Sequence, residues 1–416
     1  MKVVILNTSE QTGGAAIAAS RLKEALTGSG VKARMLTMHK ESESLTVAPA
    51  YRHPWMGKLN FVLERLPIWR ANGWQREGLF DVDTAQRGID VTQLPEFREA
   101  DVVHLHWVNQ GFLSMRSLER IVKSGKRVVW TMHDMWPFTG VCHYAHECRK
   151  FELACHDCPR LRRSGPHDLS HRTFLKKQQL NALGHISYVA CSEWLQREAL
   201  QSSLLREAHV TAIPNPINTH RYSPRPKDEA RRRIGVDPEG RYLLFSAYRT
   251  TLPIKGLAYF REACRKLAVE RPELCQGLSI LAVGKDSELL AQDFPLKVVP
   301  MGYVDSQQLM ADIYSAADAF VIPSLQDNLP NTIMEALASG VPCIGFRVGG
   351  IPEMIVHRKS GYLAEPRSAA DLMQGLAWLL GESNYDAVAQ AARQFAVQHY
   401  AEQTVAKQYI NLYQHV

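Results

Sequence analysis

The chain has 416 residues, which is too long for one ordinary hydrophobic core, so two domains are expected. It contains no run of eighteen apolar residues, so no transmembrane helix is expected. Its net charge of +7 is modest and suits anionic small molecules, an anionic membrane face or nucleic acid about equally. The first apolar run, Val3–Leu6, stops at polar Asn7 instead of extending into a signal-peptide core, which predicts a cytoplasmic protein.

Short apolar runs alternate with helix-like stretches along the first half of the chain, which predicts a parallel α/β sheet. The predicted strands are Val3–Asn7, Ala33–Met38, Asp101–His106, Arg127–Met132, His185–Ala190 and Val210–Ile213. Helices are expected at Ala15–Thr27, at Met115–Lys123 and from Ser192 onward. Residues 40–95 are less regular and hold several Pro and Trp residues. Residues 134–183 are predicted to form a long irregular insert rich in Cys and Arg.

Prolines between residues 214 and 227 indicate an interdomain linker, and a second α/β set follows it. The predicted strands are Tyr242–Ala247, Leu278–Val283, Val298–Pro300, Ala319–Ile322 and Pro342–Phe346. The predicted helices are Gly256–Val269, Ser306–Ala316, Pro330–Ser339, Ala369–Leu380, Ala387–His399 and Glu402–Tyr413.

Two acids lie around the junction between a polar loop and a helix in this second half. The loop, Pro323–Asn328, follows a strand and leads into a helix amino terminus, where open α/β sheets hold anionic ligands. Asp327 lies in the loop and Glu335 eight positions later, and two such carboxylates can accept hydrogen bonds from sugar or ribose hydroxyls. An ordinary helical Glu is the alternative, but Glu335 has apolar neighbours and a half-buried acid needs a partner.

Basic and glycine-containing loops follow the first strand of each half. Arg249 and Lys255-Gly256 follow the strand at Tyr242–Ala247 and can clamp a diphosphate, although a solvated basic loop is the commoner arrangement. Gly13-Gly14 allows close approach of a ligand to a helix start, and a plain tight turn is an equal alternative.

Three histidines stand on or after neighbouring strands. His104 and His106 alternate along one strand and should face the same side, where a structural role and a functional role are equally favoured. His133 ends the strand Arg127–Met132, where residues of a parallel sheet face the ligand crevice, so it is expected to contact a phosphate or hydroxyl.

Four of the eight cysteines lie within seventeen residues of the insert, at Cys142, Cys148, Cys155 and Cys158. Their spacing, C-x5-C-x6-C-x2-C, predicts a tetrahedral structural zinc site, for which His143, His146 and His156 are substitute ligands. Two disulfides or a catalytic thiol are the alternatives.

Residues 51–76 combine three tryptophans with five Lys and Arg residues against one acid. This composition suits peripheral contact with an anionic membrane, and a self-packed loop at the acceptor site is the alternative. Nucleic-acid binding is not expected, because no aromatic–basic binding module is present.

Taken together, these motifs resemble the retaining, nucleotide-sugar-dependent glycosyltransferases of family 4, which have the GT-B fold. In the second half the resemblance rests on Arg249 with Lys255-Gly256, on MGYV at 301–304 and on PSLQDNLPNTIMEALASGVPCIGFRVGGIPEMI at 323–355. In the first half it rests on Gly13-Gly14, on DVVHLHWVNQGFLS and on VVWTMHDMWPFTGVCHY. TMHDMWPFTG and the cysteines after it are similar to bacterial exopolysaccharide transferases of the colanic-acid type. The family pattern has Glu at the first acid, where this chain has Asp327.

The resemblance implies an α/β architecture of two Rossmann-like domains that face each other across a cleft. Residues 1–218 would form the acceptor-side domain and 219–398 the nucleotide-sugar-binding domain, and the helix within 399–416 would cross back to the first domain. Arg249 and Lys255 would neutralise the diphosphate, Glu335 would bind ribose, Asp327 the donor sugar, and Tyr303 the base. Other implied donor contacts are Gly13, Gly14, His133, Gly256, Asn328, Leu329, Pro330, Asn331 and Thr332. No metal or other cofactor is implied for the chemistry.

The implied function is sugar transfer from a nucleotide diphosphate sugar to a glycan acceptor, in particular a lipid-linked intermediate of bacterial exopolysaccharide or surface polysaccharide. Such an enzyme would work in the cytoplasm or at the inner face of the plasma membrane. The alternatives are a nucleotide-sugar epimerase of the same fold and a non-catalytic nucleotide-sugar-binding protein.

Overall fold

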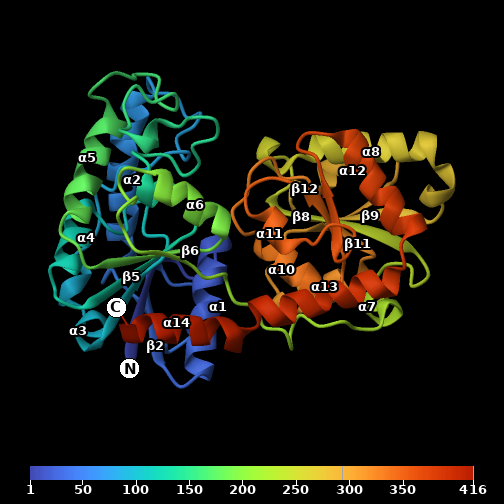
Figure 1. Ribbon diagram of the computed structural model, residues 1–416, viewed down its shortest axis with the longest axis horizontal. Coiled ribbons are helices and arrows are strands. Elements are labelled where there is room, and N and C mark those ends of the chain that lie inside the picture. Colours follow the sequence, from blue (N-terminus) through green and yellow to red (C-terminus); the bar gives the residue numbers. More distant parts are fainter. Residues whose placement is uncertain (293, 416) are drawn as a thin grey trace. The chain divides into compact units, whose positions relative to one another are not determined.

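The computed structural model describes residues 1–292 and 294–415, and the chain divides into two compact units. The N-terminal unit comprises residues 1–215 and the end of the chain from Val405 onward, and the C-terminal unit comprises Pro216–Thr404. Each unit is built around one parallel sheet (Figure 1). No helix in the described ranges is long and apolar enough to cross a membrane.

The sheet of the N-terminal unit has seven parallel strands in the order β3-β2-β1-β4-β5-β6-β7. The strands are β1 (Lys2–Ser9), β2 (Lys32–His39), β3 (Val47–Pro49), β4 (Val102–Leu105), β5 (Arg127–Met132), β6 (Ile186–Ala190) and β7 (Val210–Ala212). The helices are α1 (Gly14–Gly28), α2 (Pro54–Ala71), α3 (Pro95–Glu99), α4 (Met115–Val122), α5 (Leu169–Asn181) and α6 (Glu193–Gln201), with short 3-10 turns at Val91–Gln93, Trp136–Phe138 and Lys150–Glu152.

Both faces of this sheet are covered, which is why its strands are nearly continuous apolar runs. Along β1, Val4 and Leu6 belong to one buried cluster, and Val3 and Ile5 belong to the cluster on the other face. The last helix, α14 (Glu402–His415), places Val405, Ala406, Tyr409 and Tyr413 in the cluster that contains Val3 and Ile5. The chain therefore returns to its first strand at its end, as the red α14 beside the blue segments shows (Figure 1).

The sheet of the C-terminal unit has six parallel strands in the order β10-β9-β8-β11-β12-β13. The strands are β8 (Arg241–Arg249), β9 (Leu278–Lys285), β10 (Lys297–Gly302), β11 (Ala319–Ile322), β12 (Cys343–Phe346) and β13 (Gly361–Ala364). The helices are α7 (Lys227–Arg233), α8 (Leu257–Glu270), α9 (Gln307–Ala316), α10 (Asn331–Ala338), α11 (Ile351–Met354), α12 (Ala369–Ala377) and α13 (Tyr385–Tyr400). Short helical turns are Pro253–Lys255, Pro272–Cys275, Ser287–Gln292 and Trp378–Glu382.

Most elements expected from the sequence are confirmed, and β5 matches its predicted range to the residue. Residues 40–95, expected to be less regular, contain a helix that was not predicted, because α2 occupies eighteen of them. The sequence of α2 lacks the usual helical pattern of buried apolar residues, because Glu64 and Arg65 are buried while several apolar side chains are exposed. The insert 134–183 is irregular only up to α5, which begins at Leu169 and is capped by the side chain of Asp168. The sequence analysis also missed α7, which directly follows the proline-rich linker, and the short strand β13.

Candidate functional site

The loops after β8 and β11 meet at the point where the strand order of the C-terminal sheet reverses, which is where open α/β sheets bind ligands. The Leu325 N–H donates to the Ile254 carbonyl at 2.8 Å, which joins the two loops. Gly256 has φ 69°, and a Cβ atom there would lie 1.8 Å from the Pro323 carbonyl oxygen. Only glycine therefore allows this close approach of the two loops.

The close approach brings two of the expected site residues together. The Lys255 Nζ atom lies 2.8 Å from Asp327 Oδ2, and both side chains are only partly exposed, at 31% and 14%. The loop after β12 supports Asp327 from the other side, because the Gly350 N–H donates to the Asp327 carbonyl at 3.2 Å. A Cβ atom on Gly349 would lie 1.8 Å from that same carbonyl oxygen. A cation and a carboxylate are thus held side by side by three loops.

The helix after this loop, α10, carries the second expected acid. Glu335 is buried, and the Tyr314 hydroxyl donates to its Oε2 atom at 2.8 Å. Asn328, Leu329 and Pro330 are buried just before the helix, and no side chain caps its amino terminus. Asn331 and Thr332, in its first turn, are partly buried. The first turn contains no acid, so the partial positive charge of the helix start is not offset by a side chain there.

A more exposed group lies at the ends of β8, β9 and β10. The Arg249 Nε atom is 3.2 Å from Asp286 Oδ2. Tyr303 meets Tyr248 edge to face, with ring centroids 5.7 Å apart. The Lys285 Nζ atom donates to the Tyr248 hydroxyl at 2.7 Å. Two half-exposed rings with cations beside them form a surface on which a planar base can stack.

Several residues at this edge of the C-terminal sheet were not predicted from the sequence. Lys285 and Tyr248 stand at strand ends without any distinguishing pattern, so no motif could have identified them. The Ser324 Oγ and Gln326 Oε1 atoms are buried, and neither has a hydrogen-bond partner among residues 1–292 and 294–415. Buried polar atoms without partners are uncommon and suit a site that a polar ligand completes.

In the N-terminal unit, Gly13 and Gly14 lie between β1 and α1. Gly13 has φ 96°, a conformation that favours glycine, and apart from its chain neighbours no described residue has an atom within 4 Å of where its Cβ would be. The carboxylate of Glu41 holds the loop by accepting hydrogen bonds from the Thr12 hydroxyl at 2.9 Å and from the Ser9 hydroxyl. Burial raises the pKa of Glu41, but these hydrogen bonds outweigh it and the pKa lies below its usual value. The sequence analysis did not identify Glu41.

His104 on β4, His106 directly after it and His133 directly after β5 form a largely buried polar chain. The expectation that His104 and His106 face the same side is confirmed, since their ring centroids are 4.3 Å apart. The His106 Nδ1 atom lies 2.9 Å from His133 Nε2, and the Cys191 Sγ atom lies 3.5 Å from His133 Nδ1. Burial lowers the pKa of His133 to about 4 and that of His104 to about 3. These imidazoles are therefore neutral near pH 7 and act as hydrogen-bonding groups.

The residue after His133 is the centre of a second network that the sequence analysis overlooked. Asp134 Oδ2 accepts from Trp107 Nε1 at 2.9 Å and lies 2.7 Å from His143 Nδ1. Its Oδ1 accepts from the Trp136 N–H at 2.9 Å. Asp134 could have been predicted from its position, because an acid directly after a parallel strand lies at the ligand-facing edge of the sheet.

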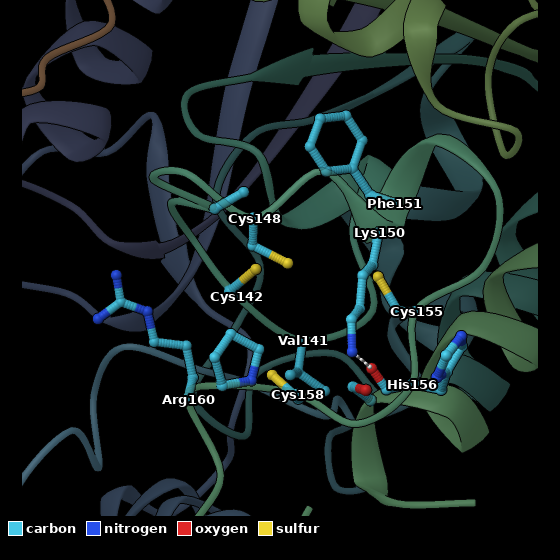
Figure 2. Close-up of a pocket in the computed structure, with 12 residues that line it drawn as sticks. Val141, Cys142, Cys148, Lys150, Phe151, Cys155, His156, Cys158 and Arg160 are labelled. Atoms are coloured by element: carbon cyan, nitrogen blue, oxygen red, sulfur yellow. Dashed lines mark hydrogen bonds between the residues drawn. The ribbon is translucent and has the colours of Figure 1, made fainter. Parts of the chain in front are cut away.

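The four clustered cysteines, here called the Cys cluster, line one small cavity in the insert (Figure 2). Cys142, Cys155 and Cys158 are buried, Cys148 is half-buried, and all four are free thiols. Burial and the neighbouring thiols raise the pKa of Cys155 and Cys158 to about 12. As the side chains stand, no group of three or more His, Cys, Asp or Glu residues in the described ranges is arranged to hold a metal ion. The zinc site therefore stays a prediction.

Two family models cover most of the chain. A model described as glycosyl transferases group 1 matches residues 240–382, and the glycosyltransferase family 4 model matches residues 12–221. The second match alone spans half of the chain. The chain belongs to glycosyltransferase family 4. It thus carries both domains of an enzyme family whose members transfer sugars.

Curated family 4 relatives show modest identity. A D-inositol 3-phosphate glycosyltransferase from Thermobispora bispora is 27% identical over 72% of this chain and 66% of that protein. The putative colanic acid biosynthesis glycosyl transferase WcaC of Escherichia coli is 24% identical over 76% of each chain. The chain thus spans about two thirds to three quarters of the length of these two relatives.

Solved structures show which fold this family 4 chain has. Anabaena HepE in complex with UDP and glucose matches with a TM-score of 0.67 at 16% identity, over 100% of both chains. WaaG, a glycosyltransferase involved in lipopolysaccharide biosynthesis, matches with a TM-score of 0.65 at 16% identity, over 99% of both chains. The chain has the GT-B fold, with two Rossmann-like domains.

Proposed function

We propose that the chain transfers a sugar, with retention of configuration, from a nucleotide diphosphate sugar to a glycan acceptor. One observation carries this proposal, namely the convergence of Lys255 and Asp327 at the β8–β11 reversal, directly before the helix that carries buried Glu335. A half-buried cation, a carboxylate and an uncapped helix start can bind a diphosphate and a sugar together.

The proposed roles follow from the contacts of each side chain. Lys255 and Arg249 neutralise the leaving diphosphate, with the start of α10 as a further positive dipole. Asp327, whose other oxygen is not used by Lys255, accepts from a donor sugar hydroxyl. Glu335 binds ribose hydroxyls, and Tyr303 with Tyr248 stacks on the base. No metal takes part in this scheme, because two cations and a helix terminus supply the positive charge.

The chemistry needs no dedicated protein base in this proposal. The acceptor hydroxyl attacks the anomeric carbon on the face from which the diphosphate leaves. The bond between that carbon and the phosphate oxygen breaks, and a donor phosphate oxygen takes the acceptor proton. The protein contributes position and electrostatic stabilisation of the leaving phosphates.

A thermal-shift screen of nucleotide sugars tests donor binding, because a ligand that binds only the folded chain raises Tm. We expect one nucleotide sugar to raise the Tm of the wild type, and Lys255→Ala to lose most of that rise. Incubation of the same donor without acceptor should then release nucleotide slowly. A donor that binds without any hydrolysis or transfer would indicate a non-catalytic binding protein, and a converted sugar without transfer would indicate an epimerase.

For the acceptor, we propose a lipid-linked intermediate of a bacterial surface polysaccharide. WcaC, whose name refers to colanic acid biosynthesis, supports a polysaccharide role. The second support is α2, whose exposed face carries Trp55, Leu59, Val62, Leu66 and Trp69 at helical spacing.

The burial of charged and apolar side chains on α2 is largely the reverse of that on an ordinary surface helix. Its buried face carries Glu64 and Arg65, which are held by hydrogen bonds to the segment 79–87. Its exposed face is apolar, and the exposed Arg52, Lys58 and Arg70 flank it. Apolar side chains with flanking cations fit the interface of an anionic bilayer. We therefore propose peripheral binding of this face to the plasma membrane.

Co-sedimentation with vesicles that contain phosphatidylglycerol tests the membrane proposal. We expect the wild type to bind, and binding to weaken with salt because the cations contribute. Leu59→Glu should abolish binding without loss of stability. Val269→Glu, which changes a more exposed apolar residue of the C-terminal unit, is the control and should bind like the wild type. Failure of the wild type to sediment would overturn the membrane proposal and leave the transfer proposal standing.

A further inference from the structure

We propose that the Cys cluster binds one structural zinc ion, and that this ion holds the insert against the polar network at the end of β5. The four thiols come from one segment of seventeen residues that contains little regular structure. Within Cys142–Cys158 the only helical element described is the short turn Lys150–Glu152. A segment of this kind needs a staple to stay ordered, and a tetrahedral zinc site is such a staple.

The size of the cavity favours a single ion. All four cysteines line it, together with Val141, Phe151 and Pro159, and its volume is about 20 Å³. This is close to the space that one water-sized occupant needs. Figure 2 shows the four sulfur atoms arranged around this pocket.

Zinc binding would draw the four sulfur atoms inward from their present positions. Zn²⁺ replaces the four thiol protons, which pass to water, and the resulting centre carries a net charge of −2. Such a buried charge needs compensating donors and cations. The backbone already supplies one donor, since the Gly140 N–H lies 3.1 Å from the Cys155 Sγ atom. Hydrogen bonds of this kind orient and tune metal ligands.

A buried cation next to the Cys cluster is the second, independent observation. Lys177 on α5 is 2% exposed, and its ammonium group donates to the carbonyl oxygens of Trp136 and Thr139, the latter at 3.0 Å. It lies 3.5 Å from the Trp136 ring centroid and within charge-interaction range of Cys142 and Cys155. In the described part of the chain no carboxylate forms an ion pair with Lys177. The carboxylates of Asp83 and Asp134 also interact with it electrostatically, and a zinc tetrathiolate centre would add negative charge next to this buried ammonium.

Ordinary core packing is the competing explanation, since free cysteines are often small buried residues. Cys264 and Cys343, in the C-terminal unit, are examples that are fully buried away from the Cys cluster. The Cys cluster differs because its four thiols share one cavity, next to a buried cation.

The position of the Cys cluster gives the zinc a role beyond local stability. His143, whose Nδ1 lies 2.7 Å from Asp134, directly follows the first cysteine of the cluster. The His143 carbonyl accepts from the Met135 N–H at 2.9 Å. A metal that holds Cys142 therefore positions His143 and, through it, the Asp134 carboxylate at the ligand-facing edge of the N-terminal sheet.

Elemental analysis of the purified full chain tests the proposal. We expect about one zinc per chain, no iron, and a several-fold lower zinc content in Cys155→Ser. Cys275→Ser changes a half-buried cysteine outside the Cys cluster and should keep its zinc. Chain purified with Co²⁺ in place of zinc should show the strong visible absorption of tetrahedral thiolate coordination. Wild-type protein without zinc, whether its four thiols are free or form disulfides, would overturn the proposal, and so would iron with sulfide.

A second measurement keeps the test valid if Cys155→Ser does not fold. A mercurial reagent added to the wild type should release zinc in proportion to the thiols that react, and the Tm of the chain should fall. Release of zinc without reaction of the Cys cluster thiols, identified by mass spectrometry, would place the metal elsewhere and overturn the proposal.

Discussion

The carboxyl edges of the two sheets differ in the charge that they present. In the C-terminal unit this edge carries a half-buried ion pair, Lys255 with Asp327, and the exposed Arg249. In the N-terminal unit the edge carries imidazoles, such as His133, that burial keeps neutral near pH 7. The same parallel architecture thus provides one edge with a cation–carboxylate pair and a further exposed cation, and one edge with neutral imidazoles beside carboxylates, such as Asp134, that hydrogen bonds hold in place.

This difference indicates different roles for the two units in the proposed sugar transfer. A leaving diphosphate carries the charge that develops in the reaction, so cations are useful on the side that binds it. An acceptor hydroxyl is neutral, and fixed neutral donors and acceptors are sufficient to orient it. Four predictions test this comparison.

The largest expected effect is on turnover after removal of the cation next to the diphosphate. Lys255→Ala should lower kcat by roughly 100- to 1,000-fold, as loss of one electrostatic stabiliser does. The circular dichroism spectrum should stay that of the wild type, because Lys255 is partly exposed. Arg249→Ala, at the more exposed cation, is the matched comparison and should cost less. Normal turnover of Lys255→Ala would mean that the charge of the C-terminal edge is not needed for transfer.

The contact between the loops after β8 and β11 is tested by a glycine substitution. Gly256→Ala should lower the free energy of unfolding by about 3 kcal/mol, because a positive φ is strained and the new Cβ would clash with the Pro323 carbonyl. Gly13→Ala, also at positive φ but in open space, should cost only about 1 kcal/mol. Urea unfolding of both variants measures the difference, and equal costs would contradict the close approach of the two loops.

A smaller effect is expected at the buried acid of α10. Glu335→Gln keeps an acceptor for the Tyr314 hydroxyl but removes the charge, so the fold should persist. The KM for the donor should rise about 10-fold, since a hydrogen bond to a charged group is worth about 1.5 kcal/mol or more. Steady-state kinetics with varied donor separates KM from kcat. Unchanged KM with a reduced kcat would place Glu335 at the reacting atoms instead of the ribose.

The smallest effect is the pH dependence of stability in the N-terminal unit. Burial lowers the pKa of His133 to about 4, below the value of about 6.5 in an unfolded chain. Between these values the unfolded state binds more protons, so stability should fall as the pH is lowered from 7 towards 4 and should not change for this reason above 7. The loss should be about 1 kcal/mol for this histidine at pH 5.5.

Thermal unfolding at several pH values measures this slope. His133→Asn should have a shallower slope below pH 7 than the wild type, because one depressed imidazole is gone. The comparison uses the slopes alone and not the Tm values at pH 7.5. Identical slopes would mean that His133 titrates normally and that the N-terminal edge is not neutral at acid pH.

How much of the candidate site was predictable depends on the kind of signal. Loops after strands could be located because apolar runs end abruptly, which identified Lys255, Asp327 and Glu335 from residue type and position alone. Glu41 and Tyr248 could not be found in this way. Glu41 and Tyr248 matter because of the residues they contact, which are far away in the sequence. The sequence around each of them does not indicate these contacts.

The sequence by itself determined the alternation of strands and helices, because the apolar period of each segment is a local property. It also determined which residues follow the strands, and hence which chemistry is available at the sheet edges. Only the tertiary structure decided the strand order, the ion pair of Lys255 with Asp327 and the common cavity of the Cys cluster. It also decided that α2 buries its charges, because burial depends on what the rest of the chain places against a helix, and no local period records that.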